Sequence, residues 1–414
     1  MQLPKMAIVK QHFAATSLAD VAGTIRSQLA AANLAEAIAP GTRIAVSSGS
    51  RGIANIPLIT RTVVDGIKEA GGEPFLLPAM GSHGGATAEG QIAVLKSYGI
   101  DEESMGCPVE STMDVVEVDA LDDGTPVLLN RLAAAADGVI LINRIKPHTS
   151  FRGVFESGLM KMMTIGLGSH KGATIAHAGG AESLARLIPA WGQAILKKAP
   201  ILLGLALVEN AYEQTMRVEA LKPSQFQRRE PQLLAEARVA MPRILVQGID
   251  LLIIEQIGKN ISGTGMDTNV VGRMWLPGVK EPTSPGVARI AVLDLTAETH
   301  GNANGVGLAD IITRRLHESI DFKTTYANVF TTTFLNRAYV PVVMETDRDA
   351  IEAALSVQPL EKTERSRVVR IKTTLDIGEI QISETLLEEF KSHPDLEPVG
   401  ELVAMEFDDE ERLL

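Results

Sequence analysis

Residues 143–177 contain a dense set of side chains that are able to do chemistry. The segment reads NRIKPHTSFRGVFESGLMKMMTIGLGSHKGATIAH and holds three histidines, several glycines, and a lysine and a glutamate that we expect to be buried. His148 follows a proline, and His177 comes sixteen positions after Lys161. Segments that only build a hydrophobic core rarely mix imidazole, amine and glycine in this way. We therefore expect this segment to surround a bound group.

Lys161 lies in GLMKMMTIGLG, between methionines on an expected helix. If its side chain faces an apolar pocket, burial disfavours the charged ammonium and leaves an amine that can act as a nucleophile. Alternatively, the stem of the side chain lies along apolar surface and the ammonium reaches solvent. The residues themselves leave both interpretations open.

His83 and His148 lie in two different loops that follow expected strands. Histidine titrates near neutral pH, and a racemase requires a general acid and a general base on opposite faces of one carbon. Each histidine taken alone is more often a surface residue, whereas the pair on two strand-end loops favours a catalytic role.

His177 is a candidate metal ligand after the small-residue run 172–176, and His170 is its rival within the same segment. One imidazole binds a metal weakly, and neither HxxxH nor HExxH spacing is present to support a site made by the protein alone.

The run Ser47-Ser48-Gly49-Ser50-Arg51 follows an expected strand and predicts an anion-binding loop. Its amides and hydroxyls suit a phosphate, and Arg51 suits a carboxylate. No GK[ST] follows, so the loop is not a Walker motif. The Gly-rich runs 263–265 and 301–307 are weaker signals, because such loops are usually only turns.

Strands and helices alternate around these loops. Apolar strands are expected at 42–48, 74–78 and 138–142, and helices at 57–70 and 88–98, with Thr87 as a cap. This alternation predicts a largely parallel α/β sheet. Loops 47–51, 81–85 and 143–148 all leave the carboxyl ends of strands, where sites form in such sheets, so we expect them to converge.

The remaining chain predicts two α/β domains with largely parallel sheets. Domain 1–247 continues with helices at 155–165 and 181–198, a strand at 201–208 and a helix at 231–240 that opens with its proline. Domain 248–397 begins with a strand at 248–255 and a Gly-rich loop at 258–273. Its later elements are strands at 288–294, 340–345 and 368–372 and helices at 308–318, 347–355 and 384–391. A final strand is expected at 400–407, and residues 398–414 are compatible with a return of the chain to the first domain.

Composition limits the partners and the compartment. The 414 residues are 45% hydrophobic and carry a net charge of −12, which argues against nucleic acid or an anionic membrane as a partner. The single cysteine, Cys107, fits a reducing cytoplasm. No signal-peptide pattern opens the chain and no apolar run has the length of a membrane span, so we expect a cytoplasmic protein.

Taken together, these motifs resemble the nickel-pincer-nucleotide-dependent lactate racemase superfamily. The similarity covers most of the chain and is densest in its first half. SSGSR stands in place of the family's SSDHTR-like loop, so Arg51 matches the family arginine. His83 in MGSHGG and His148 in a Pro-His pair match the two catalytic histidines. Lys161 matches the lysine that carries the cofactor, and His177 the nickel ligand.

The resemblance implies a pyridinium-derived mononucleotide that holds nickel through two sulfurs and one carbon and is attached to Lys161 as a thioamide. His177 is then the metal ligand, and Ser47, Ser48 and Ser50 join Lys161 in binding the cofactor. One histidine takes the hydroxyl proton of the substrate while hydride leaves the carbon for the cofactor. Hydride then returns to either face of a planar keto intermediate, and Arg51 holds a carboxylate or hydroxyl. The family's fold places this site in the cleft between two domains.

The sequence departs from the family at three places. The SSGSR loop is one position shorter and lacks the aspartate and histidine, and the segment between His148 and Lys161 is longer by a few residues. Where the family's second domain supplies a Gln and a Lys to the substrate, this chain reads MDTNVVGR, with Thr268 and Arg273 as the nearest candidates. These departures bear on the identity of the substrate.

The expected function is thus a racemase or epimerase of a 2-hydroxy acid or related sugar acid. Its expected partners are a small substrate and the proteins that synthesise the cofactor. The sequence is compatible with either a monomer or an oligomer. One alternative is a Schiff-base lyase or aldolase that uses Lys161 on keto acids. The other is a catalytically inactive homologue that still binds the cofactor.

Overall fold

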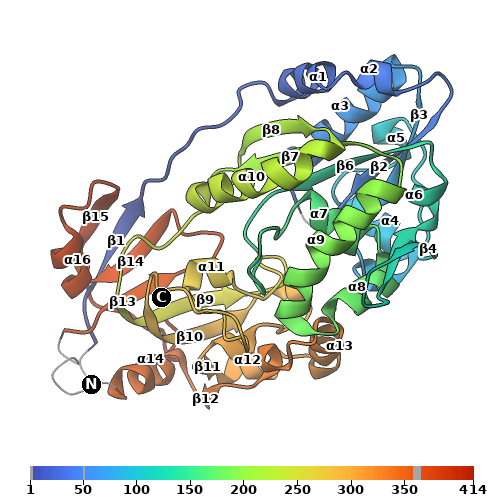
Figure 1. The fold of residues 1–414 in the computed structure, drawn as a ribbon. Helices are drawn as coiled ribbons and strands as arrows, with labels where there is room; N and C mark the ends of the chain where they lie inside the picture. The colour runs from blue at the N-terminus through green and yellow to red at the C-terminus, as the bar shows by residue number, and fades with distance from the viewer. Residues whose placement is uncertain (1–2, 50–51, 358–364) are drawn as a thin grey trace. The chain divides into compact units, whose positions relative to one another are not determined.

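The computed structural model describes residues 3–49, 52–357 and 365–414 and divides the chain into two compact units (Figure 1). The central unit is Ala14–Met241. The terminal unit joins the first residues, up to Phe13, to Pro242–Leu414. Within the described residues, no helix is both long enough and apolar enough to cross a membrane.

The central unit is built on a five-stranded sheet with the spatial order β3-β2-β6-β7-β8. Its strands are β2 (Arg43–Ser48), β3 (Glu73–Pro78), β6 (Gly138–Arg144), β7 (Ile201–Glu209) and β8 (Thr215–Leu221). β2 pairs in parallel with β3 and β6, and β6 pairs in parallel with β7. β8 runs antiparallel to β7 at the edge. The carboxyl ends of β2, β3 and β6 therefore share one end of the sheet.

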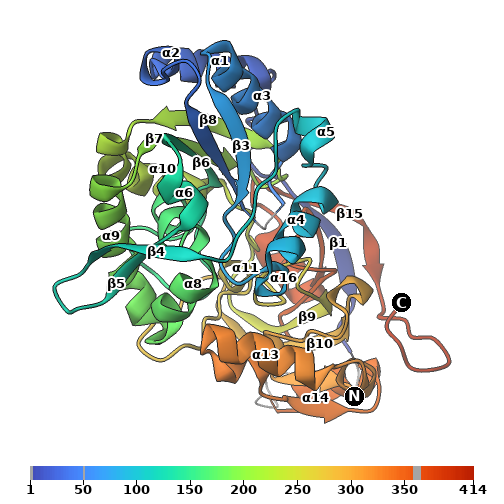
Figure 2. The same cartoon turned by 90° about the vertical axis from the view of Figure 1, so that its right-hand side faces the viewer.

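Helices cover this sheet on both faces. They are α1 (Val21–Ala31), α2 (Leu34–Ala37), α3 (Ile56–Glu69), α4 (Ala88–Ser97), α5 (Glu102–Met105), α6 (Arg131–Ala135), α7 (Leu159–Lys161), α8 (Ser169–His177), α9 (Gly180–Lys198) and α10 (Phe226–Ala240). Shorter turns are η1 (Gly84–Ala86), η2 (Met162–Gly166) and η3 (Pro223–Gln225), and a hairpin of β4 (Val115–Ala120) and β5 (Pro126–Asn130) lies beside α8 (Figure 2).

The two faces of β7 show how the helices are sorted. Successive side chains of a strand point to opposite faces, and Leu203 and Leu205 join the core beneath α1 and α3. Gly204 faces the other way, where a Cβ would lie 2.6 Å from Leu159 of α7 and from Phe226 of α10. Glycine at this position therefore lets α7, which carries Lys161, pack directly on the sheet.

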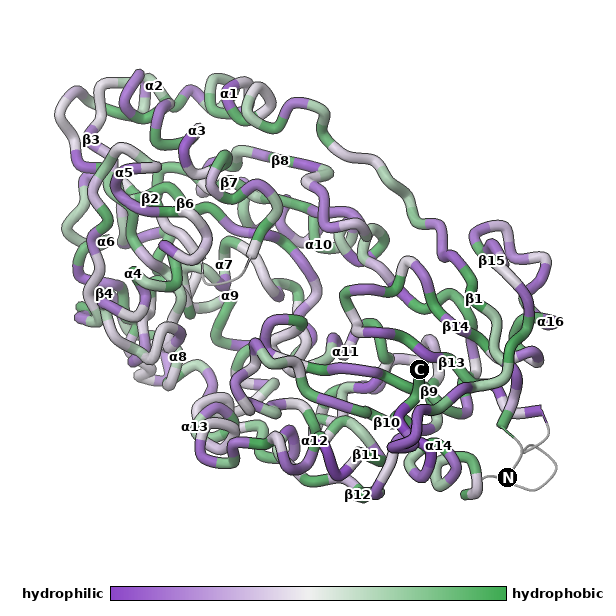
Figure 3. Tube along the Cα trace, turned by 180° about the vertical axis from the view of Figure 1, so that it is seen from behind, coloured by the Kyte–Doolittle hydropathy of each residue, from purple (hydrophilic) through white to green (hydrophobic). Residues whose placement is uncertain are grey.

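The terminal unit is built on an eight-stranded sheet with the order β12-β11-β10-β9-β13-β14-β1-β15. Its strands are β1 (Met6–Gln11), β9 (Ile249–Ile257), β10 (Val287–Leu295), β11 (Ile311–Thr313), β12 (Val342–Met344), β13 (Val368–Ile371), β14 (Glu379–Ser383) and β15 (Leu396–Val403). β12 to β13 are parallel, whereas β14, β1 and β15 pair antiparallel. Figure 3 shows apolar strands alternating with polar segments along the chain.

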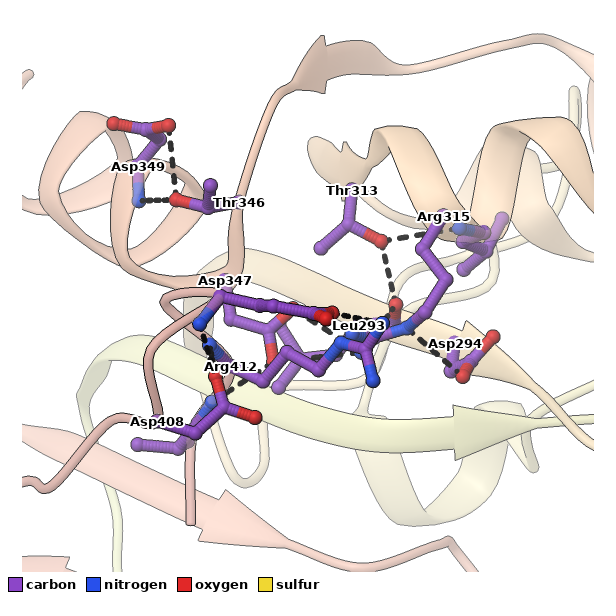
Figure 4. A network of polar contacts seen from close by, with 12 residues as sticks. Leu293, Asp294, Thr313, Arg315, Thr346, Asp347, Asp349, Asp408 and Arg412 are labelled. Atoms are coloured by element: carbon purple, nitrogen blue, oxygen red, sulfur yellow. Dashed lines mark hydrogen bonds and ion pairs between the residues drawn. The ribbon is translucent and has the colours of Figure 1, made fainter.

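Short helices and turns cover the sheet of the terminal unit. They are α11 (Thr268–Val271), α12 (Arg314–Glu318), α13 (Phe322–Thr332), α14 (Asp347–Ser356), α16 (Glu384–Phe390), η4 (Ala297–Thr299), η5 (Val306–Leu308) and η6 (Leu335–Ala338). A polar network ties several of them together (Figure 4). Arg315 of α12 donates to Asp294 of β10 at 3.0 Å and to Asp347 of α14 at 3.2 Å, which joins both helices to the sheet.

The expected class of two α/β units with largely parallel sheets is confirmed, but the division of the chain differs from the predicted one. The first strand lies in the terminal unit, and the break falls at Pro242 instead of residue 248. The final strand was expected at 400–407, with a return to the first domain as one alternative. It is β15 (Leu396–Val403) and lies in the terminal unit. β15 pairs with β1, so the two ends of the chain complete one sheet edge.

Three local predictions were wrong. The helix expected at 155–165 begins only at Leu159 and turns into the π-turn η2 after Lys161. The helix expected to open at Pro231 begins at Phe226, with the proline inside it. The expected helix 308–318 contains the three-residue strand β11 before α12 begins.

Candidate active site around Lys161, His148 and His177

The strand-end loops of the central unit converge on residues 158–177. A Cβ on Gly49, after β2, would lie 3.4 Å from the Met162 side chain. A Cβ on Gly81, after β3, would lie 3.2 Å from Ile165. Asn143, at the end of β6, donates from its side-chain amide to the Gly158 carbonyl at 2.7 Å. The expected convergence of the three loops is therefore present in the structure.

Lys161 lies where helix geometry changes. It ends α7 and is followed by a single π-turn over Met162–Gly166. Such π-turns are rare in proteins, and those that occur often lie at functional sites. Met160 and Met162 on either side are buried and Lys161 itself is half-buried. The stem of the lysine is thus held by its neighbours while part of the side chain stays accessible.

Glu230 of α10 supports the segment that leads into Lys161. Its carboxylate, 1% exposed, accepts a hydrogen bond from the Met160 backbone N–H at 3.1 Å. Burial raises the pKa of this carboxyl to about 8, against the opposing hydrogen bonds from Met160 and Leu159. A Cβ on Gly158 would lie 2.1 Å from Oε1 of Glu230. The glycine therefore makes room for a carboxyl directly beneath the lysine segment.

His177 ends α8 with its two ring nitrogens in different roles. Nδ1 lies 2.6 Å from the Ala173 carbonyl and must donate there, which leaves the lone pair on Nε2. A metal-bound histidine usually donates its second ring nitrogen to a carbonyl or carboxylate in this manner. Burial, with the nearby Lys161 charge, lowers the pKa of the ring below its usual 6.5. His177 therefore has the neutral form and the tautomer of a metal ligand.

His148 is held by a buried carboxylate. Glu156, 1% exposed, accepts from the His148 backbone N–H at 2.6 Å and from Arg238 at 2.6 Å. The His148 ring packs against Phe151, with 4.5 Å between ring centroids. Nδ1 accepts from the Ser150 backbone N–H at 3.0 Å, so the neutral ring carries its proton on Nε2.

Lys161, His148 and His177 influence one another electrostatically. Burial is the main cause that holds the pKa of His148 well below 6.5, and the charges of Lys161 and His177 add to it. Lys161 also lowers the pKa of His177. Each of these three groups is cationic when protonated, and repulsion between the charges favours neutral imidazoles at physiological pH. The amine and the two imidazoles form the centre of the candidate site.

The two described serines of the anion loop have different surroundings. Ser47 accepts from the Ile142 backbone N–H at 3.3 Å. Ser48 is 1% exposed, and its hydroxyl has no hydrogen-bond partner among the residues that the structure describes. Ser50 and Arg51 lie outside the described residues. Ser48 is thus a polar group next to the site that a bound molecule could satisfy.

His83 is exposed in the turn between β3 and η1. The side chain of Gln91 donates to the Gly81 carbonyl at 3.0 Å and to the His83 carbonyl at 3.4 Å, which fixes the turn. The Gly81 backbone packs against Ile165 and Ala173, so this turn lies beside η2 and α8. His83 is therefore presented on a turn that borders the Lys161 segment. His170, the rival metal ligand, is exposed on α8.

Arg273 and Thr268, the candidate substrate-binding residues of the terminal unit, make contacts within that unit. Arg273 donates to Asp310 at 2.7 Å, to the Leu308 carbonyl at 2.9 Å and to the Ala288 carbonyl at 3.0 Å. Its guanidinium also lies over the Trp275 ring, 4.6 Å from the centroid. Thr268 is fully buried. The Arg273 guanidinium is therefore held by contacts within its own unit, and the Thr268 side chain is enclosed.

Sequence reasoning missed the roles of Glu230 and Glu156. Glu230 directly precedes the predicted helix 231–240 and gives no sign of burial. The sequence does indicate a buried Glu156, and its 1% exposure confirms this, but the groups that the carboxylate holds are not predicted. No group of three or more His, Cys, Asp or Glu side chains suited to a metal occurs among residues 3–49, 52–357 and 365–414.

The fold and the site define an α/β protein with a lysine and two histidines gathered at the strand ends of a parallel sheet. Residues 5–185 match the family model of the lactate racemase N-terminal domain. Residues 5–185 are therefore similar to the lactate racemase N-terminal domain.

One solved structure shares the fold, and a second shows a weaker similarity. The lactate racemase apoprotein from Thermoanaerobacterium thermosaccharolyticum superposes with a TM-score of 0.52 at 12% identity, over 87% of this chain and 93% of that chain. A Thermotoga maritima protein matches with a TM-score of 0.48 at 16% identity, over 64% of this chain and 73% of that chain. No curated protein matches the sequence.

Proposed function

We propose that this protein is a racemase or epimerase that inverts a hydroxyl-bearing carbon of a 2-hydroxy acid or related sugar acid. A nickel-pincer nucleotide attached to Lys161 and ligated by His177 is the proposed cofactor. The observation that supports this proposal is the gathering of Lys161, His177 and His148 in one neighbourhood, at the strand ends of a segment similar to the lactate racemase N-terminal domain.

The residues present fit such a group. His177 offers Nε2 as a ligand because Nδ1 donates to Ala173. Lys161 is half-buried beside buried methionines, which suits an amine that is acylated and not an exposed cation. The buried Ser48 hydroxyl lacks a partner among the described residues and matches a polar atom of a nucleotide. When bound, the cofactor would supply a hydride acceptor for the carbon that is inverted.

The histidines would handle the proton of the substrate hydroxyl. His148 is neutral and carries its proton on Nε2, so it donates a hydrogen bond to a substrate oxygen. To take up a proton at Nε2, the ring must adopt the other neutral tautomer and give up the Ser150 contact. His83 is the proposed second acid–base group, since inversion moves the oxygen to a different place. Arg51 is assigned the substrate carboxylate.

The test combines mass measurement with a substrate screen. The protein is co-expressed with cofactor-synthesis proteins, which are its proposed partners, and its intact mass is measured. Lys161→Ala should carry no adduct, whereas Lys171→Ala, an exposed lysine on α8, should carry it fully. An adduct of unchanged mass on Lys161→Ala would exclude the proposed attachment.

Loaded protein is then incubated with chiral 2-hydroxy acids and sugar acids in deuterium oxide. We expect inversion without deuterium at the inverted carbon, because hydride returns internally. Deuterium at that carbon would show proton abstraction instead and would contradict the proposal. Trapping of a keto acid on Lys161 by borohydride, without nickel, would favour a Schiff-base enzyme.

A further inference from the structure

Arg337 of the terminal unit is buried without a partner. It lies in η6 and is 1% exposed. None of its three guanidinium nitrogens has a hydrogen-bond partner among the residues that the structure describes. Arg273 in the same unit shows the usual situation, with Asp310 and two carbonyls around its guanidinium. An unpaired buried charge is costly, so the surroundings of Arg337 are those of a site that lacks its anion.

The guanidinium keeps its charge in this position. Burial lowers the pKa of Arg337 to about 10, which still leaves the side chain cationic at neutral pH. Glu281 exerts an opposing electrostatic effect. The oxygens of Glu281 accept from the backbone N–H groups of Met274 and Trp275 at 2.7 and 2.6 Å, and no hydrogen bond joins this carboxylate to the guanidinium among the described residues.

The backbone of Arg337 contacts the Gly-rich loop that follows β10, and this loop meets the Gly-rich loop that follows the parallel strand β9. The Gly305 N–H donates to the Arg337 carbonyl at 2.8 Å. Gly305 has φ +105°, and a Cβ there would lie 1.7 Å from the Thr264 carbonyl, so glycine is required for the two loops to meet. Beside it, the buried Asn304 has a side-chain oxygen without a partner among the described residues. Ligands bind at the carboxyl ends of such strands.

A cavity of about 510 Å³ adjoins this region. Asn336, directly before Arg337, lines it, as do Gly307 and Tyr339. Glu281 also lines it, and Arg337 itself lies directly behind the lining residue Asn336 in the chain. The volume suits a small organic molecule, since ligand pockets commonly measure roughly 300–1,000 Å³.

We propose that the terminal unit holds an oxyanion-binding site in which Arg337 binds the carboxylate of an organic acid or a phosphate group. A guanidinium offers a planar fork of donors that matches either group. The site is independent of the nickel-pincer nucleotide and of the proposed inversion. The full-length protein without cofactor is therefore sufficient to test it.

Binding of glycolate and of inorganic phosphate is measured by calorimetry and by thermal unfolding. We expect at least one of the two anions to bind wild-type protein and to raise its unfolding temperature, since a ligand of the folded state stabilises it. Binding of glycolate alone identifies a carboxylate site, and binding of phosphate alone identifies a phosphate site. Arg337→Met should bind the anion at least tenfold more weakly. Without anion it should unfold at an equal or higher temperature, because an unpaired buried charge is removed.

Arg314→Met is the matched control, because it removes an equal charge from an exposed arginine that pairs with Glu345. Its anion affinity should equal that of the wild type. Arg337→Lys keeps the charge but loses the fork, and it should bind more weakly than the wild type. The proposal is overturned if neither anion binds wild-type protein, or if Arg337→Met and Arg337→Lys bind as the wild type does. A lower unfolding temperature of anion-free Arg337→Met would also overturn it, by marking a structural arginine.

Discussion

The carboxyl of Glu230 accepts a hydrogen bond from the backbone N–H of Met160 at 3.1 Å, one residue before Lys161. The two residues are 70 positions apart, so α10 holds the start of α7 through a single buried group. Since this carboxyl has a pKa raised to about 8 by burial, its protonation is linked to stability near physiological pH.

Glu230→Gln should make the protein less sensitive to pH. In the folded state the carboxyl titrates at about 8 instead of its ordinary 4.5, so its stabilising contribution is complete below 4.5 and is lost as pH rises through 8. Glutamine keeps an oxygen for the Met160 N–H but does not titrate. We expect near-equal stability at pH 5 and a variant that is more stable by a few kcal/mol at pH 9.

Chemical denaturation at a series of pH values measures this difference. Glu89→Gln, which changes an exposed carboxylate on α4, is the control and should run parallel to the wild type. Parallel curves for Glu230→Gln as well would show that the buried carboxyl does not titrate in this range.

Gly158→Ala should displace Glu230. The new methyl would lie 2.1 Å from Oε1, a distance that forces the carboxyl or the backbone to move. Overpacking of this kind costs about 1–3 kcal/mol, and the shift should also reduce cofactor attachment at Lys161. Denaturation and intact mass give the two readouts. At Gly378 the described residues leave a methyl open space, so Gly378→Ala is the control, and equal stability of the two variants would count against the contact.

The loops of the site were predictable because parallel α/β alternation is readable in sequence. β2, β3 and β6 are short apolar runs, and their carboxyl ends meet by topology. The supports of the site were not predictable. Glu230 reaches α7 from 70 residues away, and no local pattern distinguishes such a carboxylate from one on a solvated helix face.

The sequence does not predict strand pairings between residues that are far apart in the chain. β1 lies between β14 and β15, more than 360 residues away, and its sequence gives no sign of this partner. β11 has three residues, which is too short to interrupt the helical pattern around it. Pro231 predicts a helix start because proline is disfavoured inside a helix, but α10 begins at Phe226 and accommodates the proline in its interior.

Ser48→Ala and Ser47→Ala should differ although the residues are neighbours. The Ser47 hydroxyl accepts from Ile142, so its loss should cost about 1 kcal/mol. The Ser48 hydroxyl has no partner among the described residues, so its removal should change stability by less than about 0.5 kcal/mol. Ser48→Ala should instead lower the cofactor content. Equal destabilisation by both changes, with full cofactor content, would give Ser48 a structural role.

The tautomer and the charge state of His148 can be read by nitrogen NMR of the apoprotein. The ring should be neutral at pH 6 with its proton on Nε2, because Ser150 donates to Nδ1 and burial lowers its pKa. An imidazole whose pKa is lowered by folding gives stability that is present above about 6.5 and is lost as pH falls through the lower folded value. Lys161→Met should raise the pKa of both His148 and His177, since the lysine charge lowers both. Lys171→Met, an exposed control on α8, should leave both titrations in place. If the two histidines titrate as in the wild type after Lys161→Met, the amine does not share their neighbourhood, and a common ligand for Lys161 and His177 becomes untenable.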